Sequence, residues 1–271
     1  MPERSFKDLV VVITGASSGI GAALSYQLAE QGAKLVISAR NMKKLSAVEE
    51  TCRAKGAEVV SIQSDVTSKS ECEQLISAAV QRFGTLDMLI NNAGISMGAD
   101  FQDVKDIEFY QTLMDVNYFG SLYCTHYALP HLLKSKGRIL AISSLAGKTG
   151  VPARTGYAAA KHAVAGFFDS LRIELMAKGV SVTVIYPGFV ATDLRTKSFN
   201  ADGGPLNETF SKSTNAMTAE ECARQSLVAA LGRKRQVVMT TRAKIAQWLR
   251  LIAPRFVDRV ALKAIETSRD Q

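Results

Sequence analysis

Short apolar runs alternate with helical patterns along most of this chain, and no other feature narrows its possible folds as much. Apolar runs without polar alternation are typical of strands buried on both faces, which occur in parallel sheets covered by helices. The pattern predicts an α/β fold, a doubly wound domain with a central parallel sheet of about seven strands and helices on both faces. The expected strands are 9–14, 34–38, 57–62, 86–90, 137–143, 180–186 and 236–239.

The segments between these runs have the periodicity of amphipathic helices. We expect helices at about 18–31, 42–55, 69–83, 106–133, 155–177 and 218–231. No linker rich in Pro, Gly or Ser divides the chain, so we interpret residues 1–271 as one domain. The longest irregular segment, about 188–217, is predicted to cover the substrate, because long loops inside compact domains often bind ligands.

The composition excludes several classes of protein. Hydrophobic residues make up 47% and charged residues 21% of the chain, which is ordinary for a globular protein and argues against disordered or fibrous classes. The four cysteines have no paired spacing and the three histidines do not cluster, which predicts reduced thiols and no metal site. With no signal-peptide pattern and no long apolar run, a cytoplasmic location is expected.

The net charge of +8 lies mostly in the C-terminal tail. From residue 231 to the end there are ten Lys or Arg and three acidic residues, giving +7, so the other 230 residues carry +1. Because the charge is local and no recognition motif accompanies it, we expect no role in binding nucleic acid.

Residues 242–271 form a basic amphipathic tail in which apolar and basic side chains recur at helical spacing. Pro254 is expected to kink or divide the helix. Such a helix docks on its own domain or on a partner, or closes the substrate pocket. The alternative is peripheral contact with an anionic membrane surface.

A glycine-rich turn, TGASSGIG at 14–21, joins the first expected strand to the first expected helix. Glycines at this position let the backbone approach a pyrophosphate, and the helix N-terminus offers free N–H groups to the anion. The turn predicts a dinucleotide cofactor, with serine hydroxyls as further donors. The residues expected to bind it are Gly15, Ser17, Ser18, Gly19, Ile20 and Gly21.

The residues after the second expected strand predict which dinucleotide is preferred. An acidic residue there would hold the ribose 2′-hydroxyl, whereas an arginine accommodates a 2′-phosphate. The sequence has Arg40 and no acid at this position, and its planar guanidinium suits phosphate. We therefore expect NADP(H) rather than NAD(H).

The stretch TGYAAAK places Tyr157 and Lys161 four residues apart, on one face of an expected helix. A phenol ordinarily has a pKa near ~10, and a nearby cation lowers it. The pair therefore fits a proton donor and the cation that tunes it, although Tyr and Lys at this spacing also occur in ordinary helices. Ser144 follows an expected strand, at the sheet edge where ligands bind, but its hydroxyl could instead cap local backbone.

Four separated motifs together resemble the short-chain dehydrogenase/reductase family, over residues from about 8 to 240. They are TGASSGIG at 14–21, NNAG at 91–94, YxxxK at 157–161 and the Pro-Gly pair at 187–188. The resemblance implies a Rossmann fold and a nicotinamide cofactor. The segment SSLAGKTGVPARTGYAAAK, at 143–161, is similar to the hydroxysteroid-dehydrogenase branch. Family members are often dimers or tetramers, so a homo-oligomer is implied as well.

The resemblance also implies roles for single residues. Tyr157 matches the catalytic acid/base, and Lys161 matches the lysine that binds the nicotinamide ribose and lowers the tyrosine pKa. Ser144 matches the serine that holds the substrate oxygen, and Asn117 the asparagine that anchors a proton-relay water. Further cofactor contacts are implied for Asp65 at the adenine, Thr192 at the carboxamide, and Val66, Asn92, Ala93, Gly94, Pro187, Gly188 and Val190.

These observations predict an NADP(H)-dependent oxidoreductase acting on a ketone or secondary alcohol, with a hydrophobic substrate such as a lipid or steroid-like carbonyl. One alternative is a 3-oxoacyl-thioester reductase. Another is a non-catalytic NADP(H)-binding sensor or scaffold. Several side chains are expected as apolar walls of the pocket: Phe189, Leu194, Phe199, Leu206 and Phe210. His162 and the tyrosines at 110, 118, 123 and 127 are expected to have structural roles.

Overall fold

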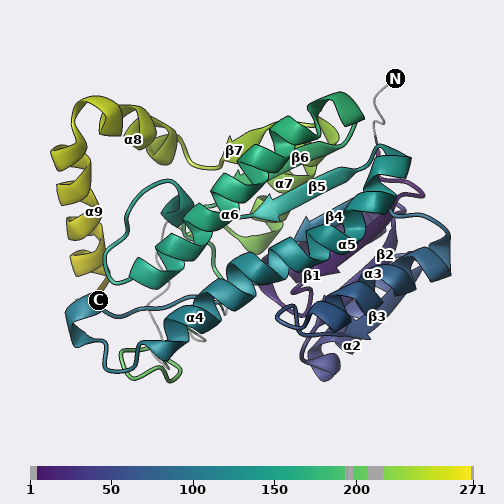
Figure 1. The fold of residues 1–271 in the computed structure, drawn as a ribbon, viewed down its shortest axis with the longest axis horizontal. Coiled ribbons are helices and arrows are strands. Elements are labelled where there is room, and N and C mark those ends of the chain that lie inside the picture. The colour runs from purple at the N-terminus through teal and green to yellow at the C-terminus, as the bar shows by residue number, and fades with distance from the viewer. Residues whose placement is uncertain (1–4, 193, 195–197, 207–215, 270–271) are drawn as a thin grey trace.

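The computed structural model describes residues 5–192, 194, 198–206 and 216–269. Its centre is one sheet of seven parallel strands in the order β3-β2-β1-β4-β5-β6-β7, which confirms the predicted doubly wound α/β architecture (Figure 1). The strands are β1 (Val10–Thr14), β2 (Lys34–Ala39), β3 (Val59–Gln63), β4 (Met88–Asn91), β5 (Arg138–Ile142), β6 (Ser181–Tyr186) and β7 (Gln236–Val238).

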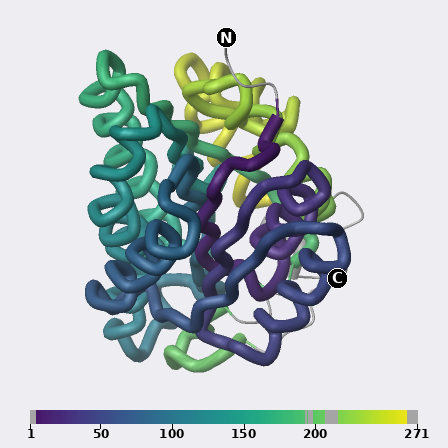
Figure 2. Tube along the Cα trace, turned by 90° about the vertical axis from the view of Figure 1, so that its right-hand side faces the viewer, coloured from purple at the N-terminus to yellow at the C-terminus, as the bar shows by residue number. Residues whose placement is uncertain are grey.

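Helices connect the strands and cover both faces of the sheet, as Figure 2 shows from the side. The α-helices are α1 (Gly19–Glu30), α2 (Met42–Ala54), α3 (Lys69–Phe83), α4 (Glu108–Met114), α5 (Gly120–Ser135), α6 (Thr155–Glu174), α7 (Ala219–Leu231), α8 (Thr241–Ile252) and α9 (Pro254–Arg269). The short helical turns are η1 (Phe101–Asp103), η2 (Asp115–Phe119), η3 (Leu145–Gly147) and η4 (Met176–Lys178).

Two hydrophobic cores lie on opposite faces of the sheet. On β1, Val11 and Ile13 belong to the core under α1, α2 and α7. Val10 and Val12 point the other way, into the core under α3, α5 and α6. Because successive side chains of a strand alternate between faces, a strand buried on both faces must be apolar throughout. This is why the strands could be recognised as uninterrupted apolar runs.

The strand order places a crevice at the centre of the sheet. β1 pairs with β2 on one side and with β4 on the other. The chain winds outward from β1 to β3 in one direction and from β4 to β7 in the other. At such a switch point the connections leave in opposite directions, so a crevice opens outside the carboxyl ends of the strands. The glycine turn after β1 and the NNAG segment after β4 both lie there.

The long helix expected at about 106–133 is present as an unbroken helical run, but it contains a π-helical turn that was not predicted. The structure has α4, then a π-helical turn at η2, then α5. In a regular α-helix the carbonyl of Leu113 would accept the backbone N–H of residue 117. Here the side-chain Nδ2 of Asn117 donates to that carbonyl at 2.9 Å. Single π turns inside α-helices often mark functional sites.

The expected substrate loop, about 188–217, is described in part. Its residues 198–206 attach to the segment after β4, where Phe199 N donates to Ser96 O at 2.9 Å and Gly98 N donates to Phe199 O at 2.8 Å. Phe199 is thereby held at the edge of the crevice. Phe210 lies outside the described residues.

The basic tail forms two helices, α8 and α9. Pro254 begins α9 directly after the break at Ala253, which confirms that this proline divides the tail. Several large apolar side chains of the tail remain exposed, among them Trp248 at 75%, Leu251 at 75% and Ile252 at 82%. Within the described part of the chain, no helix has the length and apolar character needed to cross a membrane.

Candidate active site

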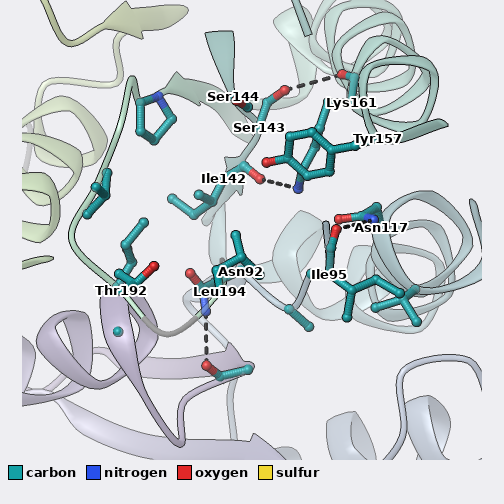
Figure 3. Close-up of a pocket in the computed structure, with 18 of the residues that line it drawn as sticks. Asn92, Ile95, Asn117, Ile142, Ser143, Ser144, Tyr157, Lys161, Thr192 and Leu194 are labelled. Carbon is teal, nitrogen blue, oxygen red and sulfur yellow. Dashed lines mark hydrogen bonds between the residues drawn. The ribbon is translucent and has the colours of Figure 1, made fainter. Parts of the chain in front are cut away.

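A cavity of about 720 Å³ lies at the carboxyl edge of the sheet and extends from the glycine turn to α6. Its size is typical of a site for a cofactor or small molecule. All the predicted catalytic and cofactor-binding residues line it except Gly21, which is buried beneath the turn. Figure 3 shows Ser144, Tyr157, Lys161 and Asn117 on one side of this cavity and Thr192 on the other.

The glycine turn is closely packed on itself. A side chain at Gly21 would place its Cβ 2.3 Å from the carbonyl oxygen of Gly15, so only glycine fits there. Ser18 is the N-cap of α1, yet its side chain makes no capping hydrogen bond. The first N–H groups of α1 and the Ser18 hydroxyl are therefore available to an anion, which fits the predicted pyrophosphate site.

Asn92 and Thr14 hold the glycine turn against the end of β4. The Asn92 Nδ2 donates to Thr14 O at 3.0 Å and to Gly15 O at 3.1 Å. The Thr14 hydroxyl oxygen accepts the N–H groups of Asn92 and Ala93, each at 3.1 Å. The Asn92 side chain is thus committed to the turn, although the residue lines the cavity. Thr14 was not predicted as a site residue, because a hydrogen bond across 78 residues leaves no local signal.

Arg40 lies at the opposite end of the cavity from Tyr157, just past β2. Its side chain is 67% exposed, and Nη1 lies 3.8 Å from Asp65 Oδ2. An exposed pair at this distance is weak, so the guanidinium can still bind an anion. Asp65 also accepts the N–H and the hydroxyl of Thr67, both at 2.9 Å. These contacts fit a site for the adenosine end of a dinucleotide.

Tyr157 and Lys161 are both buried on the first two turns of α6. The ammonium Nζ of Lys161 lies 5.7 Å from the centre of the Tyr157 ring and donates to Ile142 O at 3.1 Å. Burial lowers the pKa of Lys161 to about 8. Burial raises the pKa of Tyr157, while a hydrogen bond from Ser144 and the charge of Arg154 act in the opposite direction. The cavity thus holds a desolvated cation beside a desolvated phenol.

The two serines after β5 have different partners. Ser143 is buried, and its hydroxyl donates to the backbone carbonyl of Lys161 at 3.2 Å, which ties β5 to α6. The Ser144 hydroxyl oxygen accepts the N–H of Ala146 at 3.2 Å and is hydrogen-bonded to Tyr157. The Ser144 hydroxyl therefore caps η3, as expected for a structural role. It also faces the Tyr157 phenol, as expected for a residue that holds the substrate oxygen.

Asn117 is buried at the inner end of the cavity, in the π turn. Its Nδ2 donates to Ile95 O at 3.0 Å and to Leu113 O at 2.9 Å. Its Oδ1 has no hydrogen-bond partner among the residues that the structure describes. A Cβ added at Gly94 would lie 2.8 Å from this Oδ1 and 3.5 Å from Lys161 Nζ. Both polar atoms therefore border the same small space beside Gly94, and a buried acceptor without a donor calls for one.

The remaining predictions on single residues concern packing. His162 is exposed, and its Nδ1 bonds Ala158 O within α6 at 2.8 Å, which agrees with a structural role. The four tyrosines on the long helix are partly buried against the cores. Phe189, Leu194 and Phe199 line the cavity as expected. Leu206 instead packs toward Gly98, where an added Cβ would lie 3.0 Å from it.

The cysteines show a contact that their spacing does not predict. All four are free and buried, and the Sγ atoms of Cys72 and Cys124 lie 3.5 Å apart between α3 and α5. Among the residues that the structure describes, no group of three His, Cys, Asp or Glu side chains is placed to hold a metal ion.

Comparison with known proteins agrees with this geometry. A family model described as short chain dehydrogenase matches residues 9–203. A Dictyostelium discoideum protein named dehydrogenase/reductase SDR family protein 7-like is 34% identical over 98% of this chain and 85% of its own length. The Arabidopsis thaliana 11-beta-hydroxysteroid dehydrogenase-like 2 is 41% identical over 77% of this chain and 68% of its own.

A solved structure shares the fold. The crystal structure of a short chain dehydrogenase/reductase from Burkholderia phymatum, in complex with NAD, superposes with a TM-score of 0.81. The two are 25% identical, and the match covers 92% of this chain and 94% of the other. The family model, the named relatives and this structure all point to one family. The chain therefore belongs to the short-chain dehydrogenase/reductase family of oxidoreductases.

Proposed function

We propose that this protein is an NADP(H)-dependent oxidoreductase that interconverts a hydrophobic ketone and its secondary alcohol, with Tyr157 as the acid/base. The observation that carries the proposal is the buried pair of Tyr157 and Lys161, whose ammonium lies 5.7 Å from the phenol ring in a cavity that begins at a phosphate-binding turn. A buried cation beside a buried phenol is unfavourable for stability, so its presence favours a catalytic role.

The residues of the chain divide the proton chemistry between them. Tyr157 gives its hydroxyl proton to the substrate oxygen in reduction and takes it back in oxidation. Lys161 stabilises the phenolate that remains, because an opposite charge favours the ionised form. Ser144 holds the substrate oxygen near the phenol. Asn117 Oδ1 and Lys161 Nζ border one space, where a water between them would return the proton to Tyr157.

The cavity fits a nicotinamide dinucleotide. The uncapped start of α1 and Ser18 suit the pyrophosphate, and Arg40 suits a phosphate on the adenosine ribose. When bound, the cofactor supplies or accepts the hydride. The Burkholderia relative was solved with NAD. The proposed preference for NADP(H) rests on Arg40 and on the absence of an acidic residue at the end of β2.

The substrate side of the cavity is mostly apolar. Ile95, Val151, Phe189, Leu194 and Phe199 line it, which suits a lipid or steroid-like carbonyl. The Arabidopsis thaliana relative is named 11-beta-hydroxysteroid dehydrogenase-like 2. The Sesamum indicum relative, named 11-beta-hydroxysteroid dehydrogenase A, is 35% identical over 92% of this chain. These names support a hydrophobic alcohol or ketone as the substrate class.

The test measures NADPH oxidation by the fall in its absorbance. The candidate substrates are small diketones, 3-oxoacyl thioesters, steroid ketones and long-chain 3-keto lipids in micelles. Tyr157→Phe is expected to bind NADPH as the wild type does and to lose about 10²–10⁴-fold in turnover. Tyr127→Phe, at a half-buried tyrosine outside the cavity, is the matched control. Wild-type turnover by Tyr157→Phe would contradict the mechanism. Inactivity on the whole panel, with NADPH still bound, would favour a sensor.

We also propose, for the tail, that the exposed apolar face of α8 lies on an anionic membrane surface of the cytoplasm. Trp248, Leu251 and Ile252 are exposed, so docking on the protein's own domain does not account for them. Arg250 and Arg255 lie on the same helix pair, and their charge complements anionic lipid. Cosedimentation with anionic vesicles, but not with zwitterionic ones, is the expected result. If the protein sediments with neither type of vesicle and is a dimer or tetramer in solution, the exposed face of α8 is better explained by contact with a partner subunit.

A further inference from the structure

Arg154 lines the cavity and, like Lys161, has no carboxylate partner in the part of the chain that the structure describes. Arg154 is the N-cap residue of α6, three positions before Tyr157, and lines the same cavity. Its Nη1 donates to the hydroxyl oxygen of the buried Ser96 at 3.2 Å. Among the residues that the structure describes, no carboxylate lies within ion-pair distance of Arg154. The exposed arginines Arg53 and Arg224, in contrast, each have an acidic partner on their own helix.

The local backbone holds Arg154 in place. Its N–H donates to Val151 O at 3.2 Å, and its carbonyl accepts the N–H of Ala158 at 2.8 Å. The preceding residue, Ala153, has a φ of +60°, a left-handed conformation that is unfavourable for alanine. The carbonyl of Ala153 accepts Ala99 N at 3.0 Å, which secures this conformation. The backbone at Arg154 is therefore fixed by contacts with Val151, Ala158 and Ala99, while Ser96 holds the guanidinium.

The guanidinium still has donors to offer. Its Nε and Nη2 have no hydrogen-bond partner within the described chain, and neither is sealed from solvent. Burial lowers the pKa of Arg154, so its environment disfavours the charge. A cation that is largely desolvated and has one neutral partner is unfavourable, and an anion bound at its two open donors would offset this cost. A planar guanidinium with two free donors suits a carboxylate or phosphate oxygen.

We propose that Arg154 binds an anionic oxyacid group of the substrate, a carboxylate or a phosphate, and so selects amphipathic keto acids over neutral ketones. The anionic group would lie close to the reacting carbonyl, because Arg154 and Tyr157 are one helical turn apart. The rest of the substrate would occupy the apolar part of the cavity, beside Val151, Leu194 and Phe199. This inference rests on the proposed function and names the substrate class of the same site.

A different role for Arg154 makes a different prediction. Its charge favours the Tyr157 phenolate, so removing it would raise the pKa of Tyr157. A residue that only tunes Tyr157 would change kcat and its pH profile to the same extent for every substrate. A residue that binds a substrate anion changes KM for charged substrates and leaves neutral ones alone. The two roles are therefore separated by comparing an acid with its ester.

The experiment uses the NADPH-bound enzyme with a matched set of substrates: a medium-chain keto acid, its methyl ester, and the corresponding keto phosphate. Arg154→Met is expected to lower kcat/KM for the preferred anion by about 10- to 100-fold, mainly through KM, as expected for a lost charge-assisted hydrogen bond. The loss on the ester is expected to be several-fold smaller than the loss on the acid, because only the effect on the pKa of Tyr157 reaches both substrates, so the readout is the ratio of kcat/KM for acid and ester. Arg154→Lys should recover part of the loss, and Arg172→Met, further along α6, is the control.

Direct binding separates this inference from the proposed function. Titration of Tyr157→Phe with an unreactive fatty carboxylate and with an alkyl phosphate of equal length measures affinity without turnover. Weaker binding of either anion in the Arg154→Met background supports the anion site, and the tighter of the two identifies the substrate group. Equal affinity for the anions with and without Arg154, or equal losses of kcat/KM on acid and ester, would overturn the proposed anion site. If no ketone is reduced but binding still needs Arg154, the proposed function fails and the anion site stands.

Discussion

Replacing Lys161 with methionine is expected to stabilise the cofactor-free protein while abolishing its activity. The ammonium of Lys161 is buried, and burial lowers its pKa from an ordinary 10.5 to about 8. Within the described residues its one hydrogen bond is to Ile142 O, a neutral acceptor, at 3.1 Å. Methionine has a similar length and no charge, so it fills the site without the desolvation of an ammonium.

The size of the effect follows from the two pKa values. A difference of 2.5, from 10.5 in the unfolded chain to about 8 in the fold, corresponds to about 3 kcal/mol of unfolding free energy. The lost hydrogen bond to Ile142 opposes this by about 1 kcal/mol. Lys161→Met should therefore raise the free energy of unfolding by about 2 kcal/mol near pH 7, or the midpoint of thermal unfolding by roughly 4–8 °C.

The stabilisation has a defined pH dependence. Between about pH 8 and pH 10.5 the unfolded chain holds the proton on Lys161 more tightly than the fold does, so wild-type stability gains from this group as pH rises. The destabilisation of the wild type by the buried ammonium is fully present below about pH 8 and is mostly relieved near pH 10. The advantage of Lys161→Met is thus expected to shrink to about zero near pH 10, since the lost hydrogen bond then balances what remains.

The assay is urea unfolding of wild type and Lys161→Met without cofactor, at about pH 7 and about pH 10, with the exposed Lys178→Met as control. The control is expected to match the wild type at both pH values. A Lys161→Met protein less stable than wild type near pH 7 would refute the argument that the buried charge is unfavourable. An advantage that persists near pH 10 would assign it to packing instead of charge.

Three further substitutions test the site. Gly94→Ala puts a Cβ 2.8 Å from Asn117 Oδ1, so kcat should fall more than about tenfold and stability by about 1–3 kcal/mol, measured by turnover and urea unfolding. In steady-state assays, Arg40→Ala should raise KM for NADPH about tenfold or more and leave KM for NADH nearly unchanged. Equal changes in KM for both cofactors would contradict a contact between Arg40 and the 2′-phosphate. Thr14→Val removes the acceptor of two backbone N–H groups after β4, each at 3.1 Å, and should cost about 1–3 kcal/mol in unfolding experiments, whereas Thr14→Ser should retain most of the stability.

The strands and the glycine turn could be predicted because they depend on local patterns. A strand buried on both faces must be apolar throughout, so β1 and β2 are visible as runs such as VVVIT and KLVISA. The turn requires glycine at Gly21 because another backbone atom lies where a Cβ would be. The tail was divided correctly at Pro254 because proline cannot continue a helix.

The parts that could not be predicted depend on contacts between distant segments. The π turn leaves the apolar periodicity nearly intact, so the pattern over 106–133 predicts one regular helix. The contact between Cys72 and Cys124 joins residues 52 apart. Arg154 lies inside the segment 143–161 that resembles the family, but that it lacks a counterion among the described residues emerges only from its surroundings in the fold. The available signal was its position three residues before Tyr157, at the start of α6.

The π turn at η2 lets the continuous helical run from α4 to α5 present its apolar side chains in two different directions. Each residue of an α-helix advances about 100° around the axis, and the extra residue of a π turn adds one such step. Beyond the turn, Cys124 and Leu132 face the sheet; before it, Phe109 and Leu113 face the wall of the cavity. Deleting one residue there would rotate the two halves out of phase. Thus a single π turn sets the angle between the helix surface that packs on the sheet and the helix surface that backs the cavity.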